Sequence, residues 1–281
     1  MMKKFIFIFL NVIMLITMTN INAKTQKQPI TFIFDFDNTF YNGSKCGSMT
    51  HVLFKNAVQR VVKEGKNKEA IVYINNNIKM LEKKEEAKAM MQNLHKNFKV
   101  NIEKDDFDNT LKYVTEHKTE GLINMANRVQ KMGHKLIILG GGAWGCGIIP
   151  QFAKENLGLE NKNIYSGCLP DFSFESIGKT LDIKYKYMNC EDKKLPEPLS
   201  QKKSELIRKL KKEGKIKGMV VHIGDGENDL EVWNAKEADH FIGFGVNKYR
   251  EVVKNGSKIY VKTMIEFEKE IEKILLEYNK K

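Results

Sequence analysis

Two pairs of aspartates are the residues of this chain best suited to chemistry. Asp35 and Asp37 directly follow the apolar run at residues 30–34, and a second pair, Asp225 and Asp229, follows another such run. Aspartates in turns often serve as helix caps, but four acids at one sheet edge would repel one another without a cation. Carboxylate oxygens on glycine-rich turns are ligands that Mg²⁺ prefers. The repeated pattern therefore predicts a Mg²⁺ site.

Lys203 is the candidate for balancing charge. It lies beside Lys202 in the first turn of a helix predicted to begin at Ser200. Cations there oppose the positive end of the helix dipole, so two of them together favour a nearby anion. The alternative is chance placement in a chain where Lys and Arg total 47.

Three short apolar runs are expected to carry these residues. Each is rich in Ile, Val, Leu or Phe and stops at Gly or Asp; they are residues 30–34, 135–139 and 219–223. Such runs are typical of parallel strands buried on both faces. Ligands collect at the carboxyl ends of strands in open α/β sheets. We therefore expect Asp35, Gly140 and Asp225 to converge.

Helical patterns alternate with these runs and predict a doubly wound α/β fold. Residues 120–131 and 200–212 carry apolar side chains at helical spacing, residues 239–243 form a further strand, and residues 263–278 form a closing helix.

Residues 46–118 interrupt the alternation. They show no strand pattern and are rich in helix-forming residues, with Asp105, Asp106 and Asp108 placed to begin the last helix. We expect a helical cap at 46–118, inserted into a core made of residues 24–45 and 119–281.

The motifs at the predicted strand ends resemble those of the haloacid dehalogenase superfamily, in its phosphoserine-phosphatase-like branch. Asp35-Phe-Asp-Asn-Thr39 matches the first motif, Lys203-Ser-Glu-Leu-Ile207 the third, and Gly224-Asp-Gly-Glu-Asn-Asp-Leu230 the fourth. The resemblance covers residues 30 to 245 and implies a Rossmann-like core, with the helical insertion similar in kind to the family's cap.

This resemblance implies hydrolysis of a small phosphate monoester through an aspartyl-phosphate. Asp35 would be the nucleophile, and Asp37 would protonate the leaving oxygen and then deprotonate water. Mg²⁺ would be held by the Asp35 carboxylate, the Asp37 backbone carbonyl and the Asp225 carboxylate. The remaining residues implied are Lys203 and Asn228, for the nucleophile or the substrate, and Asp229, for the metal shell.

The second motif departs from the family. A Ser or Thr is expected at the end of the second strand, where this chain has Gly140. The missing hydroxyl removes a hydrogen bond worth about 0.5–1.5 kcal/mol. Backbone N–H groups of Gly140 and Gly141 are then the expected substrate contacts, and three consecutive glycines favour positive φ at Gly140. The alternative function is a phosphate- or metal-binding protein that has lost turnover.

Two further features bear on the ligand. Residues Gly140 to Gly145 satisfy G-x-G-x-x-G, a weak dinucleotide signal here because no acid ends the next strand. The resemblance implies an acidic residue just after the first motif, to receive the amino group of phosphoserine, but no Asp or Glu lies between Asp37 and Glu64. Phosphoserine is therefore disfavoured, and the basic, Lys-rich cap suits an anionic ester such as a sugar phosphate or nucleotide. Phe40 and Tyr41 are the nearby aromatics for a choline-type head group.

The charge, the amino-terminal residues and the cysteines limit the remaining classes of function and location. The formal charge is +12, but Arg occurs only four times, which argues against nucleic-acid readout. Residues 1–23 predict a signal peptide, hence an exported, periplasmic or extracellular protein with no membrane span after cleavage. The alternative is a retained membrane anchor, which the short apolar run interrupted by Asn11 disfavours. Export would permit disulfides among four cysteines whose pairing the sequence leaves open: Cys46, Cys146, Cys168 and Cys190.

Overall fold

The computed structural model describes residues 27–43, 47–82, 84–140, 145–167, 188–190, 200 and 202–280. A seven-stranded sheet has the order β4-β3-β2-β1-β5-β6-β7. Its strands are β1 (Thr31–Asp35), β2 (Lys135–Leu139), β3 (Ile164–Ser166), β4 (Met188–Asn189), β5 (Val220–Gly224), β6 (His240–Phe244) and β7 (Ile259–Val261). All pairings are parallel except that of β4 with β3.

Helices cover both faces of the sheet, and alternate residues of β1 show why. Phe32 and Phe34 point into a core shared with one set of helices, whereas Ile33 points into a second core on the other face. The first set comprises α6 (Glu120–Lys131), α7 (Gly145–Leu157) and α12 (Met264–Lys280). The second set comprises α9 (Lys203–Lys212) and α10 (Glu227–Asn234), and α11 (Glu251–Gly256) packs beside α10. A short 3-10 helix, η2 (Asn161–Asn163), precedes β3. The predicted doubly wound α/β fold is confirmed.

The differences from prediction lie at element ends. The four predicted strands begin within one residue of their expected positions. The helix expected from Ser200 begins instead at Lys203, with Lys202 as its N-cap. Ser200 precedes the helix, and its hydroxyl contacts the backbone of Lys202 and the carboxylate of Glu205.

The sheet edge carries a disulfide that the sequence left undetermined. Cys146, near the start of α7, is bonded to Cys190, which follows the antiparallel strand β4, with a Cα–Cα distance of 5.1 Å. The bond joins α7 to this edge of the sheet. Cys46 and Cys168 lie outside the described residues.

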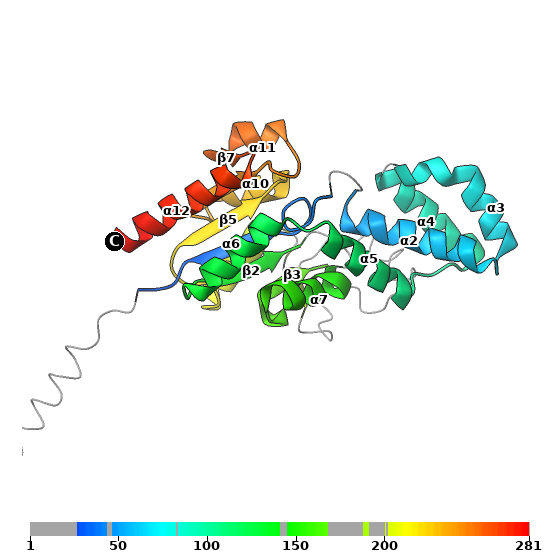
Figure 1. Ribbon diagram of the computed structural model, residues 1–281, viewed down its shortest axis with the longest axis horizontal. Helices are drawn as coiled ribbons and strands as arrows, with labels where there is room; N and C mark the ends of the chain where they lie inside the picture. The colour runs from blue at the N-terminus through cyan, green and yellow to red at the C-terminus, as the bar shows by residue number, and fades with distance from the viewer. Residues whose placement is uncertain are drawn as a thin grey trace, which may run out of the picture.

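The segment after β1 is helical. It contains α2 (Met49–Glu64), α3 (Lys68–Asn77), η1 (Ile78–Glu82), α4 (Lys84–Phe98) and α5 (Lys104–Glu116). Figure 1 shows these helices gathered beyond the sheet, on the side toward which β1 runs. The division of the chain into a cap at residues 46–118 and a core stays a prediction.

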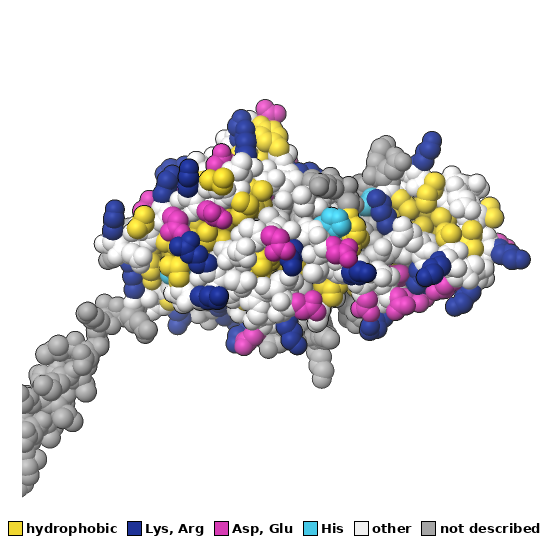
Figure 2. All heavy atoms as spheres, in the orientation of Figure 1, with side chains coloured by type: hydrophobic (Ala, Val, Ile, Leu, Met, Phe, Trp, Pro, Cys, Tyr) yellow, Lys and Arg dark blue, Asp and Glu magenta, His cyan; other side chains and the backbone are white. Residues whose placement is uncertain are grey.

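Charged side chains of both signs lie on the surface. On the face drawn in Figure 2, Lys and Arg side chains are spread over both parts of the molecule and are interspersed with Asp and Glu. Within the described ranges, no helix has the length and apolar character needed to cross a bilayer.

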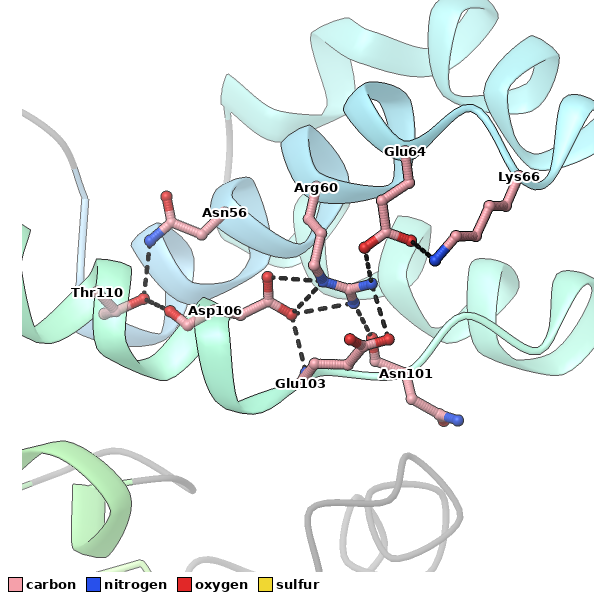
Figure 3. A network of polar contacts seen from close by, with 8 residues as sticks. All are labelled: Asn56, Arg60, Glu64, Lys66, Asn101, Glu103, Asp106 and Thr110. Atoms are coloured by element: carbon pink, nitrogen blue, oxygen red, sulfur yellow. Dashed lines mark hydrogen bonds and ion pairs between the residues drawn. The ribbon is translucent and has the colours of Figure 1, made fainter.

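A buried ion pair fixes the packing of α2 against α5 (Figure 3). Arg60 Nε lies 3.0 Å from Asp106 Oδ1, and the Asp106 side chain is fully buried. The same guanidinium contacts Glu103 Oε1 at 2.8 Å and the Asn101 carbonyl at 2.7 Å. Asp106 also accepts from the backbone N–H of Glu103, completing a capping box. The acids expected to begin this helix therefore do so, with Asp106 additionally neutralised by Arg60.

We predict that Arg60→Ala lowers the free energy of unfolding by about 3–5 kcal/mol, because it leaves the buried Asp106 carboxylate unpaired. Lys104→Ala is the matched control, since Lys104 pairs with Asp108 at the exposed surface and its loss should leave the free energy of unfolding nearly unchanged. Urea unfolding of both variants measures the difference. Equal effects would show that Arg60 does not neutralise a buried charge.

Candidate active site

Asp35 is the last residue of β1, at the carboxyl edge of the sheet. Its neighbours on the two adjacent strands are Leu139 of β2 and the residues that end β5. Residues 31–35 are all buried, and this burial fixes the register of β1 between the two neighbouring apolar strands. Asp35 is thereby held at the carboxyl end of β1. The Asp35 carboxylate is thereby carried into the interior, where little water reaches it.

Lys203 crosses from α9 to the end of β1. Its ammonium Nζ lies 2.6 Å from Asp35 Oδ1 and 2.6 Å from Asp229 Oδ1, and all three side chains are buried. The anions expected near Lys203 are thus these two carboxylates. Lys203 is the first residue of its helix, so the stem leaves the helix end directly toward β1.

Asp225 and Asp229 come from the turn between β5 and α10. Asp229 is the third residue of α10, and its Oδ2 accepts from the Gly226 N–H at 3.0 Å. Gly224 must be a glycine, because a Cβ there would lie 2.2 Å from Asp229 Cγ. Asp225 Oδ2 accepts from Arg250 Nε at 2.9 Å. Both carboxylates therefore have fixed orientations.

His222 adds a buried contact to Asp229. Its Nε2 lies 2.9 Å from Asp229 Oδ1, and its ring is fully buried beside Phe241. Burial lowers the pKa of His222, with Lys203 lowering it further, against the opposing effect of Asp229. A neutral imidazole donating Nε2–H to the carboxylate fits this environment. His222 therefore packs in the core and also orients the Asp229 carboxylate.

The three buried acids differ in their proton affinity. Burial raises the pKa of Asp35 well above its ordinary value, and the Lys203 charge only partly offsets this. Burial and the neighbouring Asp229 raise the pKa of Asp225 to about 6, despite Arg250. Burial would also raise the pKa of Asp229, but Lys203 and His222 outweigh it and hold the pKa below its ordinary value. Asp229 is thus the permanent anion of the cluster.

The cluster fits a divalent cation. One carboxylate oxygen each from Asp35, Asp225 and Asp229 can be chosen such that all three lie within 4.8 Å of one another. When all three carboxyl groups are ionised, three negative charges face two positive ones, from Lys203 and Arg250, and the buried site then carries an excess of negative charge. Hard oxygen ligands with this excess suit Mg²⁺.

Asp37 stands apart from that cluster, at the entrance to the helical segment. Its Oδ1 accepts from the backbone N–H of Met49, the first residue of α2, at 2.9 Å. This contact places the carboxylate between the core and the helices. A metal contact through the backbone carbonyl of Asp37, as the resemblance implies, leaves its carboxylate for proton transfer.

Gly140 directly follows β2, one residue beyond the neighbour of Asp35. Its N–H donates to the Tyr165 carbonyl at 2.9 Å and is therefore committed to the backbone rather than to a ligand. Its φ is not positive, so the conformational reason expected for this glycine is wrong. The reason is space: a Cβ would lie 2.2 Å from Ile149 Cδ1 and 3.3 Å from Ser166 Oγ. Gly141 lies outside the described residues.

The structure brings together Asp35, Lys203, Asp225 and Asp229 and leaves Asn228 exposed in the first turn of α10. Sequence reasoning missed Arg250, which reaches Asp225 from the loop after β6. The scarcity of Arg in this Lys-rich chain was the available signal, since Arg is favoured for fixed pairing with a carboxylate.

A three-layer α/β core with an acid-lined carboxyl edge and a helical insertion defines the class of the protein, and comparison with known proteins gives its family. The sequence matches the pattern of the haloacid dehalogenase-like hydrolases over residues 31–235. The chain belongs to this family.

Relatives refine the resemblance to the phosphoserine-phosphatase-like branch, which is confirmed. The chain is 29% identical to the phosphoserine phosphatase of Mus musculus and 28% identical to that of Homo sapiens, each over 160 residues. These matches cover 56% of this chain and 62% of the mouse and human proteins. The chain thus matches less than two thirds of the length of these relatives.

A solved structure supports the fold. The phosphoserine phosphohydrolase-like protein from Francisella tularensis subsp. tularensis SCHU S4 superposes with a TM-score of 0.53 at 21% identity. The superposition covers 88% of this chain and 100% of that one, so the likeness extends over core and insertion together.

We predict that the metal-free protein loses stability as the pH rises from the ordinary aspartate pKa of 3.8 through about 6. Folding raises the pKa of Asp225, so its stabilising effect is present below 3.8 and lost as the buried carboxyl ionises, by up to about 3 kcal/mol. The raised pKa of Asp35 acts in the same direction. The depressed pKa of Asp229 acts only below its ordinary value.

Urea unfolding at several pH values, with EDTA or with Mg²⁺, measures this dependence. Mg²⁺ should stabilise the protein more at pH 8 than at pH 5, since protons compete for the same carboxylates. Asp225→Asn should flatten the pH dependence. A wild-type stability that is constant over this range in EDTA would contradict the prediction.

Proposed function

We propose that this protein is a Mg²⁺-dependent phosphohydrolase that cleaves a small phosphate monoester through an aspartyl-phosphate on Asp35. The observation that carries the proposal is the meeting of Asp35, Lys203, Asp225 and Asp229 at the carboxyl ends of β1 and β5. The family membership and the phosphoserine phosphatase relatives support it. Asp35, Asp225 and the Asp37 carbonyl would hold Mg²⁺, which when bound neutralises charge on the transferring phosphoryl group.

In the first step, one carboxylate oxygen of Asp35 attacks phosphorus. The bond from phosphorus to the leaving oxygen breaks, and that oxygen keeps the electron pair and takes a proton from Asp37. Lys203, fixed between Asp35 and Asp229, holds the Asp35 carboxylate in place and supplies positive charge beside the transferring group. Burial excludes competing water from the nucleophile.

In the second step, a water molecule attacks the phosphorus of the aspartyl-phosphate. Asp37 accepts a proton from that water, and the bond between phosphorus and the Asp35 oxygen breaks. Inorganic phosphate and the Asp35 carboxylate result. The position of Asp37, between the core and the start of α2, suits a group that must reach both the leaving oxygen and the water.

The substrate is proposed to be a small anionic ester. The sequence has no Asp or Glu between Asp37 and Glu64 that could bind an amino group, which disfavours an amino-bearing substrate. Phe40 and Tyr41 are fully buried in the core, so they are unsuited to an aromatic cage for a choline-type head group. Sugar phosphates and nucleotides remain the classes to test.

A phosphate- or metal-binding protein without turnover is the second candidate. Gly140 favours it, because the position has neither a hydroxyl nor a backbone N–H to offer to phosphate. Binding of phosphate and Mg²⁺ without release of product from any ester would support this candidate.

We further propose export to the periplasm or the cell exterior. The basic and then apolar residues 1–23 support it, and so does the Cys146–Cys190 disulfide, a bond typical of oxidising compartments. Amino-terminal sequencing of the exported fraction, with a mature chain expected to begin near Lys24, tests the proposal.

We predict that Asp35→Asn abolishes Mg²⁺-dependent hydrolysis of p-nitrophenyl phosphate, because an amide oxygen is a very poor nucleophile toward phosphorus. The variant should stay folded, since it keeps the shape of the side chain. Asp108→Asn, an exposed acid of α5, is the matched control and should retain wild-type activity. Residual turnover of Asp35→Asn in a clean preparation would exclude Asp35 as the nucleophile.

We predict that Gly140→Ser lowers activity, because its Cβ would collide with the buried Ile149 Cδ1. Adding Ile149→Val removes that atom and should restore turnover, with a gain of up to about tenfold over Ile149→Val alone if the new hydroxyl reaches the phosphate. Steady-state kinetics of the two single variants and the double variant measure this. Unchanged rates in all three would place Gly140 away from the phosphate.

A further inference from the structure

The two linkers that connect the core with the helical segment run side by side. The outgoing linker (residues 36–43) and the returning linker (residues 117–119) form a bridge at Tyr41 and Lys118. Thr119 N–H donates to the Phe40 carbonyl at 2.8 Å, and Asn42 N–H donates to the His117 carbonyl at 3.0 Å. Displacement of one linker therefore moves the other.

The outgoing linker begins with the turn that holds Asp37. Thr39 N–H and Tyr41 N–H both donate to the Phe36 carbonyl, at 3.2 and 3.3 Å, and Asn38 adopts a left-handed φ of 58°. Such a closed turn moves as a unit, so the position of the Thr39 carbonyl reports the position of Asp37.

Asn247, in the loop after β6, contacts both this turn and the returning linker. Its Nδ2 donates to the Thr39 carbonyl at 3.0 Å and to Thr119 Oγ1 at 2.6 Å. A carboxamide NH₂ has two N–H groups, so one donor serves each linker. The carbonyl of Thr39 only accepts, which fixes the amide orientation.

The loop that carries Asn247 is itself anchored. Gly245 N–H donates to the Val261 carbonyl at 2.8 Å, and Arg250 N–H donates to Tyr260 Oη at 3.1 Å. The loop between these anchors ends at the guanidinium that holds Asp225. Asn247 therefore connects both linkers to the part of the core that also positions a metal-binding acid.

We propose that Asn247 is a positioning residue, which holds the Asp37 turn and the returning linker in register so that Asp37 reaches the leaving oxygen. The role rests on the proposed phosphatase function. Loss of the contact leaves the binding groups of the core in place but lets the proton donor drift. Turnover should therefore fall while substrate affinity changes little.

The test compares Asn247→Ala, Asn247→Asp and Thr119→Val with Thr119→Ser and Lys248→Ala. Asn247→Asp keeps the shape but turns an oxygen toward the Thr39 carbonyl, and Thr119→Val removes only the second acceptor. Thr119→Ser restores that hydroxyl, and Lys248 is an exposed residue of the same loop. We measure kcat and KM for p-nitrophenyl phosphate, melting temperature, and hydrogen exchange of the linker amides.

Both Asn247 variants should lower kcat about tenfold, with KM changed less than about twofold, at temperatures well below their melting points. Thr119→Val should give a smaller loss, and Thr119→Ser and Lys248→Ala should match wild type. The amides of Asn42 and Thr119 should exchange faster in the Asn247 variants. A lower melting temperature with unchanged kcat would reduce Asn247 to a structural contact and overturn the proposal.

The two proposals fail in different ways. A wild-type protein that hydrolyses no ester refutes the proposed function, whereas the exchange measurement still decides whether Asn247 holds the linkers. Unchanged exchange at Asn42 and Thr119 in Asn247→Ala would overturn this inference even in an active enzyme.

Discussion

The site depends on one interaction, the contact of the Lys203 ammonium with Asp35 and Asp229. Asp35 ends β1, and Asp229 lies in the first turn of α10, which follows the neighbouring strand β5, so the fold itself places these two carboxylates close together in the interior. Two like charges there would repel each other and would lack water to solvate them. Lys203 bonds an oxygen of each at 2.6 Å and makes the arrangement tolerable. A buried group of charges such as this one adds little net stability to a fold. Buried titratable groups with shifted pKa values cluster at functional sites, so a chemical role explains this contact better.

The three acids around Lys203 differ in how readily they take up a proton, and this difference determines what the site can bind. Asp229 is held ionised by Lys203 and by His222, whereas burial favours the protonated forms of Asp35 and Asp225. In the proposed mechanism, a divalent cation would displace those protons and leave Asp35 ionised, as a nucleophile must be near neutral pH. With all three acids ionised, the cation would also turn an excess of negative charge into an excess of positive charge, which favours a phosphate dianion.

The sequence was sufficient for residues fixed by strand ends and insufficient for residues brought in by loops. Asp35 and Asp225 follow apolar runs, so their meeting follows from the parallel sheet. Arg250 and Asn247 lie on a loop whose path depends on where Tyr260 and Val261 anchor it, and no local pattern encodes that path. Gly140 shows a different failure. Consecutive glycines indicated a backbone requirement, but the requirement is room for Ile149, a residue of the next helix.

In the proposed mechanism, the helical segment contributes to the chemistry through the backbone N–H of Met49. Met49 N–H donates to Asp37 Oδ1, and Ser48 caps the same helix, so the start of α2 is fixed relative to the proton-transfer group. The orientation of the Asp37 carboxylate therefore depends on where α2 begins. In the proposed mechanism the same carboxyl group first donates a proton to the leaving oxygen and later accepts one from water. A change in the position of α2 relative to the core would therefore misplace this group for both steps.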